Sequence, residues 1–261
     1  VGSAAQTFDF TDKPATTEDL TVSSGKNIVR GTDYSYKNGV LTVLNSIEIT
    51  IENTDKNTPT TDRIVIADSA GNAKVTLAGV NIDVSSLDNT AAFLYNSSEN
   101  YSTNVTIKLA DGTTNTLKSG KGCAGLQKNG TYGNLTIDGT GKLHATGGAG
   151  GAGIGGGNGG NGFDISIRNG TVTAIGGANS DDSSGTGAGI GGGFCGEGNG
   201  LSVTGGTVTA TGGAGSTTGA GIGGGGNASG SNIVIKGGTV TANGGAATLY
   251  GGAGIGGGAQ N

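Results

Sequence analysis

A seven-residue string, Gly-Ala-Gly-Ile-Gly-Gly-Gly, occurs four times in the second half of this chain at a nearly constant interval. The isoleucines of the four copies are separated by 36, 32 and 33 residues, and they are Ile154, Ile190, Ile222 and Ile255. A fixed period of roughly 20 to 50 residues is typical of a solenoid, because each unit buries its apolar face against the next one. The repeat therefore constrains the fold more strongly than any single motif.

Each repeat has the same internal order. A short alternating apolar run, such as Ile233-Val234-Ile235, precedes Gly-Thr-Val-Thr-Ala, as at Gly238–Ala242. A Gly-rich stretch of variable length, such as 176–186, then leads to the next Gly-Ala-Gly-Ile. The β-branched residues and the period of two favour strands, and no window has the period of a helix. Each repeat is therefore predicted to form three short strands of one coil of a parallel β-helix, with the variable stretch leaving as a loop.

Side-chain alternation assigns the two faces of these strands. If the valines of Thr-Val-Thr-Ala point inward, the flanking threonines point outward. We expect the inward residues of successive coils to stack as Ile165/Leu201/Ile233, Val172/Val208/Val240 and Ile154/Ile190/Ile222/Ile255. The outward threonines then form two files on one flat face, Thr171/Thr207/Thr239 and Thr173/Thr209/Thr241.

These six threonines are the candidate ligand-binding residues. Regular hydroxyl and methyl groups on a rigid plane suit a regular ligand, such as a glycan chain or ice. The alternative is that threonine is simply a favourable residue at exposed strand positions. The chain has no Trp and 6 Tyr, so an aromatic platform for stacking sugars is not expected and the site would be shallow and weak.

The repeat continues, less regularly, toward the N-terminus. Cys123-Ala124-Gly125-Leu126 is predicted to occupy the Gly-Ala-Gly-Ile position, and Ala92-Phe93-Leu94 to occupy it one coil earlier, with Leu94 matching Leu126. Residues 40–51 are predicted to form the first coil. An open solenoid end needs protection, and residues 1–37, with Phe8, Phe10, Tyr34 and Tyr36, are the candidate cap.

The prediction is therefore an all-β, single-stranded parallel β-helix of about seven coils with an N-terminal cap. It forms a single domain over 1–261, with the cap at 1–37, irregular coils at 38–146 and regular Gly-rich coils at 147–261. We expect the chain to be a segment of a longer one with further domains, because it contains no Met and has no recognisable cap at its C-terminus.

Composition restricts the partners and the compartment. The net charge is −5 without a basic cluster, which argues against nucleic acid, and no run of 18 apolar residues could span a membrane. Few charged residues occur after residue 147, which favours an extracellular or cell-surface protein. Cys123 and Cys195 would lie two coils apart, about 10 Å along the axis, so we expect two free, buried thiols.

The middle of the chain resembles a known family. Lys74–Ile82, Leu109–Leu117 (Leu-Ala-Asp-Gly-Thr-Thr-Asn-Thr-Leu) and Leu135–Leu143 are similar to the carbohydrate-binding β-helix family of clostridial-type bacterial surface proteins. The resemblance covers about residues 60–175. It implies a right-handed helix that binds plant cell-wall polymers, cellulose and pectic acid among them, with calcium and without lyase activity. Where that family is expected to carry Asn-Asp before Gly-Ile, this chain has Gly and Ala, so most of its acidic calcium ligands are missing.

The other motifs are weaker indications of function. Each Gly-Ala-Gly-Ile-Gly-Gly satisfies the dinucleotide fingerprint, but no helix is expected after it. Asp181 and Asp182 are the one adjacent acidic pair in the Gly-rich half; they could help to hold calcium or could simply be solvated. His144, the single histidine, is expected on the surface of a sheet without a metal or catalytic role.

Catalysis is not expected, because glycoside hydrolysis needs a carboxylate pair and no nucleophile–base pair is indicated. The sequence thus predicts a non-catalytic carbohydrate-binding or adhesive module that contacts a polysaccharide through the threonine-bearing sheet or through the loops before Gly-Ala-Gly-Ile. A structural stalk or spacer is the first alternative, and ice binding through the threonine files is the second.

Overall fold

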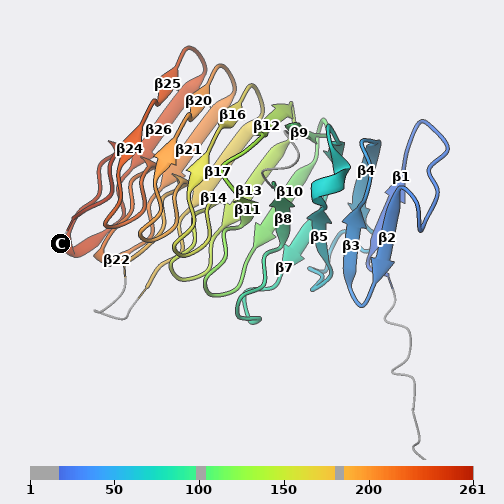
Figure 1. Cartoon of the computed structure of the whole chain (residues 1–261), viewed down its shortest axis with the longest axis horizontal. Coiled ribbons are helices and arrows are strands. Elements are labelled where there is room, and N and C mark those ends of the chain that lie inside the picture. The colour runs from blue at the N-terminus through green and yellow to red at the C-terminus, as the bar shows by residue number, and fades with distance from the viewer. Residues whose placement is uncertain (1–17, 98–103, 180–184, 261) are drawn as a thin grey trace, which may run out of the picture.

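The computed structural model describes residues 18–97, 104–179 and 185–260. Strands stack coil after coil along the long axis, from the first strands at one end to the C-terminal strands at the other (Figure 1). From β3 onward, every strand pairing between coils is parallel. The prediction of an all-β parallel solenoid is therefore confirmed. Helix in the described residues is limited to one 3-10 turn, η1 (Asp68–Ala70).

Three long sheets form the sides of the coils. Sheet A has the order β1 (Leu20–Ser23), β4 (Glu48–Asn53), β6 (Lys74–Leu77), β9 (Asn104–Leu109), β12 (Asn134–Gly139), β16 (Ile165–Ile167), β20 (Ser202–Val203) and β25 (Val234–Ile235). Sheet B has the order β2 (Tyr34–Lys37), β3 (Val40–Val43), β5 (Arg63–Ile66), β8 (Phe93–Asn96), β11 (Leu126–Asn129), β14 (Ile154–Gly155), β18 (Ile190–Gly191), β23 (Ile222–Gly223) and β28 (Ile255–Gly256). Sheet C contains β7 (Asn81–Asp83), β10 (Thr114–Lys118), β13 (Lys142–Thr146), β17 (Thr171–Ile175), β21 (Thr207–Thr211) and β26 (Thr239–Asn243).

The structure also has two smaller sheets that the sequence pattern did not indicate. Their strands come between the strands of the long sheets in the sequence. Sheet D joins three two-residue strands that precede the sheet A strands, β15 (Gly162–Phe163), β19 (Gly198–Asn199) and β24 (Gly230–Ser231). Sheet E joins two strands of the variable segments that follow sheet C, β22 (Gly215–Thr217) and β27 (Ala247–Tyr250).

Sheet C has six strands, so six successive turns carry a strand in all three long sheets. A partial turn, β3 and β4, precedes them and corresponds to the first coil predicted at residues 40–51. The length of the solenoid is therefore about six turns, close to the seven expected from the repeat.

The core is the set of stacked inward side chains. Val172 pairs with Val208 and Val208 with Val240, while Ile154, Ile190 and Ile222 form the second stack. Val172 and Val208 are fully buried, whereas Val240 is half-buried because its coil is the last one described. The inward positions are thus those that the period of two predicted.

One register prediction is wrong by a single residue. Leu126 pairs with Phe93, and not with Leu94. Phe93 is fully buried and Leu94 is half-buried on the outer side of β8. A shift of one residue along a strand exchanges its two faces, and the apolar run Ala92-Phe93-Leu94 offers no alternation that would reveal the error.

The described part of the predicted cap, residues 18–37, pairs with the first turn in the opposite direction. β1 runs antiparallel to β4, and β2 runs antiparallel to β3. The hydroxyl of Tyr36 donates a hydrogen bond to buried Asp62 and accepts one from the amide of Leu20 at 3.0 Å. Burial, and then the bond to Asp62, raise the pKa of Tyr36 above its usual range. Phe8 and Phe10 lie outside the described residues.

Candidate functional site

The threonine face is the outer surface of three neighbouring strands, β17, β21 and β26. We use this name for the six threonines that the sequence singled out. They pair as predicted, Thr171 with Thr207 and then Thr239, and Thr173 with Thr209 and then Thr241. The strands match residue for residue over five positions without a bulge, so the two files are straight and regular.

The hydroxyls of this face point away from the core. The inward valine and alanine alternate with them along each strand, and Val172 and Ala210 are fully buried. Thr171, Thr207 and Thr239 are exposed. Thr241 is exposed too, whereas Thr173 and Thr209 are half-buried. None of the six hydroxyls bonds to another described residue.

Toward the N-terminus, other residue types replace some of the threonines on the outer surface of sheet C. The same two files continue through Lys142 and His144 on β13, and then through Thr114 and Thr116 on β10. His144 is exposed on the sheet, as predicted. The unbroken threonine lattice is therefore restricted to the last three strands of sheet C.

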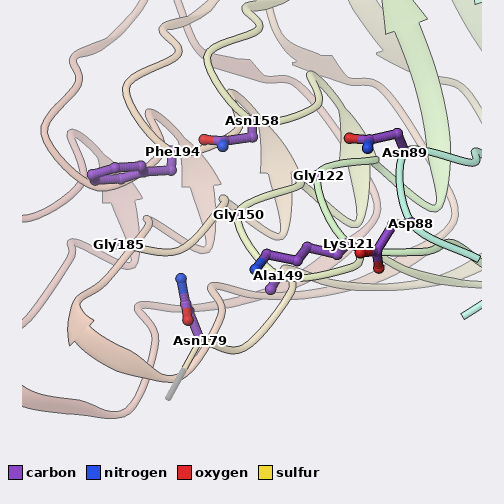
Figure 2. Close-up of a pocket in the computed structure, with 10 residues that line it drawn as sticks. All are labelled: Asp88, Asn89, Lys121, Gly122, Ala149, Gly150, Asn158, Asn179, Gly185 and Phe194. Carbon is purple, nitrogen blue, oxygen red and sulfur yellow. The ribbon is translucent and has the colours of Figure 1, made fainter. Parts of the chain in front are cut away.

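The second candidate site is concave and lies mainly at the turns that connect sheet C to sheet B (Figure 2). We call it the turn cleft; its volume is about 220 Å³. Its lining comes from four coils and consists of Asp88, Asn89, Lys121, Gly122, Ala149, Gly150, Asn158, Asn179, Gly185 and Phe194. Most of these residues belong to the segments that precede the Gly-Ala-Gly-Ile position, which the sequence predicted as an alternative contact region.

Backbone hydrogen bonds between coils hold the turn cleft in shape. The amide of Asn89 donates to the carbonyl of Lys121, and the amide of Gly122 donates to the carbonyl of Ala149, both at 2.9 Å. From the next corner of the coil, the Asn158 amide donates to the Gly122 carbonyl at 2.8 Å.

The Phe194 amide likewise donates to the Gly150 carbonyl at 2.7 Å. Together these bonds bring side chains that lie up to about 100 residues apart in the sequence into one cleft.

Sequence reasoning did not select the individual residues of the turn cleft. Asn158 and Phe194 occupy the same position of successive repeats, four residues after Ile154 and Ile190, but they differ in residue type, and Lys121 lies at another position of an earlier repeat. The one available signal was that their segments border the Gly-Ala-Gly-Ile positions, where the repeat varies in length.

The metal ligands suggested by the sequence cannot be placed among the described residues. Asp181 and Asp182 lie outside the described residues. Within 18–97, 104–179 and 185–260, no group of three His, Cys, Asp or Glu side chains could hold a metal ion. The same part of the chain has no helix long and apolar enough to cross a membrane.

Both cysteines are free, as predicted, but they differ in exposure. Cys123 is buried, and burial raises the pKa of its thiol. Cys195 is exposed, which corrects the expectation of two buried thiols. Its backbone turns at a φ of 59°, outside any strand, so its side chain does not follow the alternation of the repeat.

Comparison with known proteins agrees with the fold. A protein-family model described as beta helix repeat matches residues 135–158, 165–194 and 233–259. These segments contain strands of the three long sheets, β12 to β14, β16 to β18, and β25, β26 and β28. No curated protein and no solved structure matches the chain significantly. The paired strands and the family match together support a β-helix repeat protein.

Proposed function

We propose that this chain is a non-catalytic polysaccharide-binding module of a secreted or cell-surface protein. The observation that carries the proposal is the threonine face, with six unbonded hydroxyls in two straight files. Neighbouring hydroxyls repeat about every 4.8 Å across the strands and about every 6.6 Å along them. A ligand that uses such a surface must itself be regular over several repeats, as a polysaccharide chain is.

The chemistry of the face favours many weak contacts over one strong contact. A threonine hydroxyl both donates and accepts hydrogen bonds, as sugar hydroxyls do. Each such bond contributes only about 1 kcal/mol in water, so binding depends on several threonines acting together. No aromatic ring lies at the outward positions of β17, β21 and β26, and we therefore expect low affinity for short oligosaccharides and retention on polymers.

The direct test is retention of the purified domain on insoluble cellulose and on soluble pectic and host glycans, with calcium and with a chelator. Retention on one polymer class supports the module, and loss of retention with chelator would place a metal ion at the contact. Passage through every polymer would contradict the proposal and would favour the structural stalk.

Ice binding is the competing function for the same face, because the unbroken register of the two files also suits an ordered layer of water. It predicts thermal hysteresis and faceted ice crystals in dilute solutions of the domain. Polymer retention without either effect favours the polysaccharide, whereas ice shaping without retention favours ice.

A further inference from the structure

Strand β13 carries the only two ionisable side chains on the outer surface of the last four strands of sheet C, Lys142 and His144. They occupy the positions that Thr171 and Thr173 hold on the next strand. We propose that this cationic strand binds an anionic group of a sparsely charged polysaccharide, whose neutral units lie on the threonine face. The proposal rests on the proposed function and narrows its substrate class.

The difference between β13 and the threonine strands is confined to the outer surface. At its inward positions β13 keeps apolar residues, Leu143 and Ala145, which are buried like the inward residues of β17. Lys142 and His144 are both exposed. The packing of the core therefore does not explain this lysine and this histidine, because neither side chain contributes to it.

Lys142 has no ion-pair partner in the part of the chain that the structure describes. Nor do the side chains of Lys142 and His144 donate a hydrogen bond to another described residue. The lysine on the preceding strand differs, because Lys118 pairs with Asp83 at 3.2 Å. Asp111, at the corner before β10, accepts a hydrogen bond from a threonine of the next coil at 2.8 Å. The Lys142 ammonium is thus available to an anionic group of a ligand.

The two side chains of the cationic strand can contact the same anionic group. Lys142 and His144 are two residues apart on one strand, which places their Cα atoms about 6.6 Å apart. The ammonium offers three donors on a flexible stem, and the imidazole offers a ring N–H. A carboxylate or a sulfate ester has at least two oxygens that can accept such bonds, so either group suits this strand.

The distribution of charge along the sheet favours a polymer with few charges. One outward file crosses five neighbouring strands (Figure 1), and its residues are Thr114, Lys142, Thr171, Thr207 and Thr239. Only one of these positions is cationic. A polymer with an anion on every unit would place most of its charges against threonines, where the lost hydration of the charges is not compensated. A neutral polymer with an occasional anionic group matches the file better.

Hydroxyl groups also continue on the N-terminal side of the cationic strand. Thr114 and Thr116 on β10 pair with its two residues and line a groove of about 480 Å³ together with Asn81. Lys56 also borders this groove, but its ammonium is paired with Glu52 at 3.0 Å. A polymer that follows the files along the solenoid axis therefore meets hydroxyl groups on both sides of the cationic strand.

The test compares one polymer in three forms by isothermal titration calorimetry. The forms are glucuronoxylan, which has a neutral backbone with occasional carboxylates, the same polymer after reduction of its carboxyl groups, and the reduced polymer with a low level of sulfate esters. We expect the wild type to bind both charged forms about fivefold more tightly than the reduced form, the effect of one exposed charge contact. This preference should disappear in about 0.5 M salt, which screens such contacts. Polygalacturonate, with a charge on every unit, should bind less tightly than glucuronoxylan.

Lys142→Thr, alone and combined with His144→Thr, should abolish the preference for the charged forms. Both variants should fold, because they give β13 the outward residues of β17. Lys142→Arg keeps the positive charge and should keep the preference. Lys108→Thr is the matched control: it removes an exposed positive charge from sheet A and should also keep the preference.

The proposal is overturned if the wild type binds the three forms equally, if Lys142→Thr keeps the preference, or if polygalacturonate binds most tightly. Binding of the reduced form tests the proposed function separately, because that polymer carries no charge. Equal binding of all three forms would thus overturn the cationic strand and leave the proposed function standing. Binding of none of them would also overturn the cationic strand, and the retention panel would then decide the proposed function.

Discussion

Gly191 stacks directly beneath Gly223 in sheet B, and a Cβ on Gly191 would overlap the carbonyl oxygen of Gly223. Gly191 also has a φ of 132°, a conformation that L side chains rarely adopt. Gly155, with a φ of 131°, and Gly223, with a φ of 136°, share both features, whereas Gly256 in the last coil shares only the positive φ. The glycine that follows each buried isoleucine is therefore required by the stacking of the coils.

Gly191→Ala is predicted to destabilise the domain by about 3 kcal/mol or more, from backbone strain and overlap together. Urea unfolding followed by circular dichroism would measure the loss. Gly159→Asn is the control: a Cβ at Gly159 has open space, and Cys195 and Asn227 already adopt positive φ at the equivalent turns. We expect a change below about 1 kcal/mol there. Equal losses in the two variants would contradict the stacking account.

Lys128 is predicted to reduce stability at neutral pH. It points into the core beside Tyr95, is 1 % exposed, and its Nζ donates to the Gly130 carbonyl at 3.2 Å. Burial lowers the pKa of Lys128 to about 8. Below pH 8 the amine is charged in both the folded and unfolded states, so the folded state carries the full cost of burying the charge. Between about pH 8 and 10.5 the folded state releases the proton first, and stability should rise with pH.

Lys128→Met should therefore stabilise the domain at pH 7 by on the order of 1–3 kcal/mol, and this gain should shrink by pH 10. Unfolding free energies at the two pH values provide the measurement. Lys108→Met, at an exposed position of β9, should change little at either pH. A destabilised Lys128→Met at pH 7 would mean that Gly130 and the Tyr95 ring fully compensate the buried charge.

Tyr36→Phe is predicted to weaken the attachment of β1 and β2 to the first turn. It removes the donor to buried Asp62 and the acceptor of the Leu20 amide. The Leu20 amide then loses its acceptor, whereas Asp62 keeps the hydrogen bond from the Asp19 amide at 3.1 Å. A buried polar group left without a partner costs about 1–3 kcal/mol. Tyr34→Phe is the matched control, because the Tyr34 hydroxyl makes no hydrogen bond to described residues. Faster amide exchange at Leu20 in Tyr36→Phe alone would support the prediction, and equal exchange in both variants would refute it.

The two thiols are predicted to react at very different rates. Exposed Cys195 should be modified by a thiol reagent in the native protein, whereas Cys123 should react only after unfolding, because it is buried and its pKa is raised. Mass spectrometry of the labelled domain would count the modified thiols. Rapid native labelling of Cys123 would show that its corner of the coil opens readily.

Periodicity was sufficient to predict most of the fold. The alternation around Val172 and Val208 identified the inward residues, because a strand exposes opposite faces at successive residues. Periodicity does not identify the inward residues where apolar and polar residues do not alternate. At Ala92-Phe93-Leu94 all three residues are apolar, and the register was misplaced by one residue. Cys195 is exposed and not buried as predicted, because it lies in a turn with positive φ, to which no strand periodicity applies.

The two candidate sites differ in how far the sequence could reveal them. The threonine face is generated by the repeat itself, so the pairing of Thr171, Thr207 and Thr239 could be predicted before the structure. The turn cleft joins Lys121 and Phe194 from corners two coils apart, and their meeting depends on backbone hydrogen bonds that the sequence does not encode as a pattern.

The most direct test of the proposed function is polymer retention of the triple variant in which Thr171, Thr207 and Thr239 are changed to Lys. The matched control places three lysines in the same coils on sheet A, at Ser166, Ser202 and Val234, which also form one outward file. The account predicts that the threonine variant loses retention on the polymer that the wild type binds and that the control keeps it. Full retention by a folded threonine variant would contradict the threonine face as the binding surface.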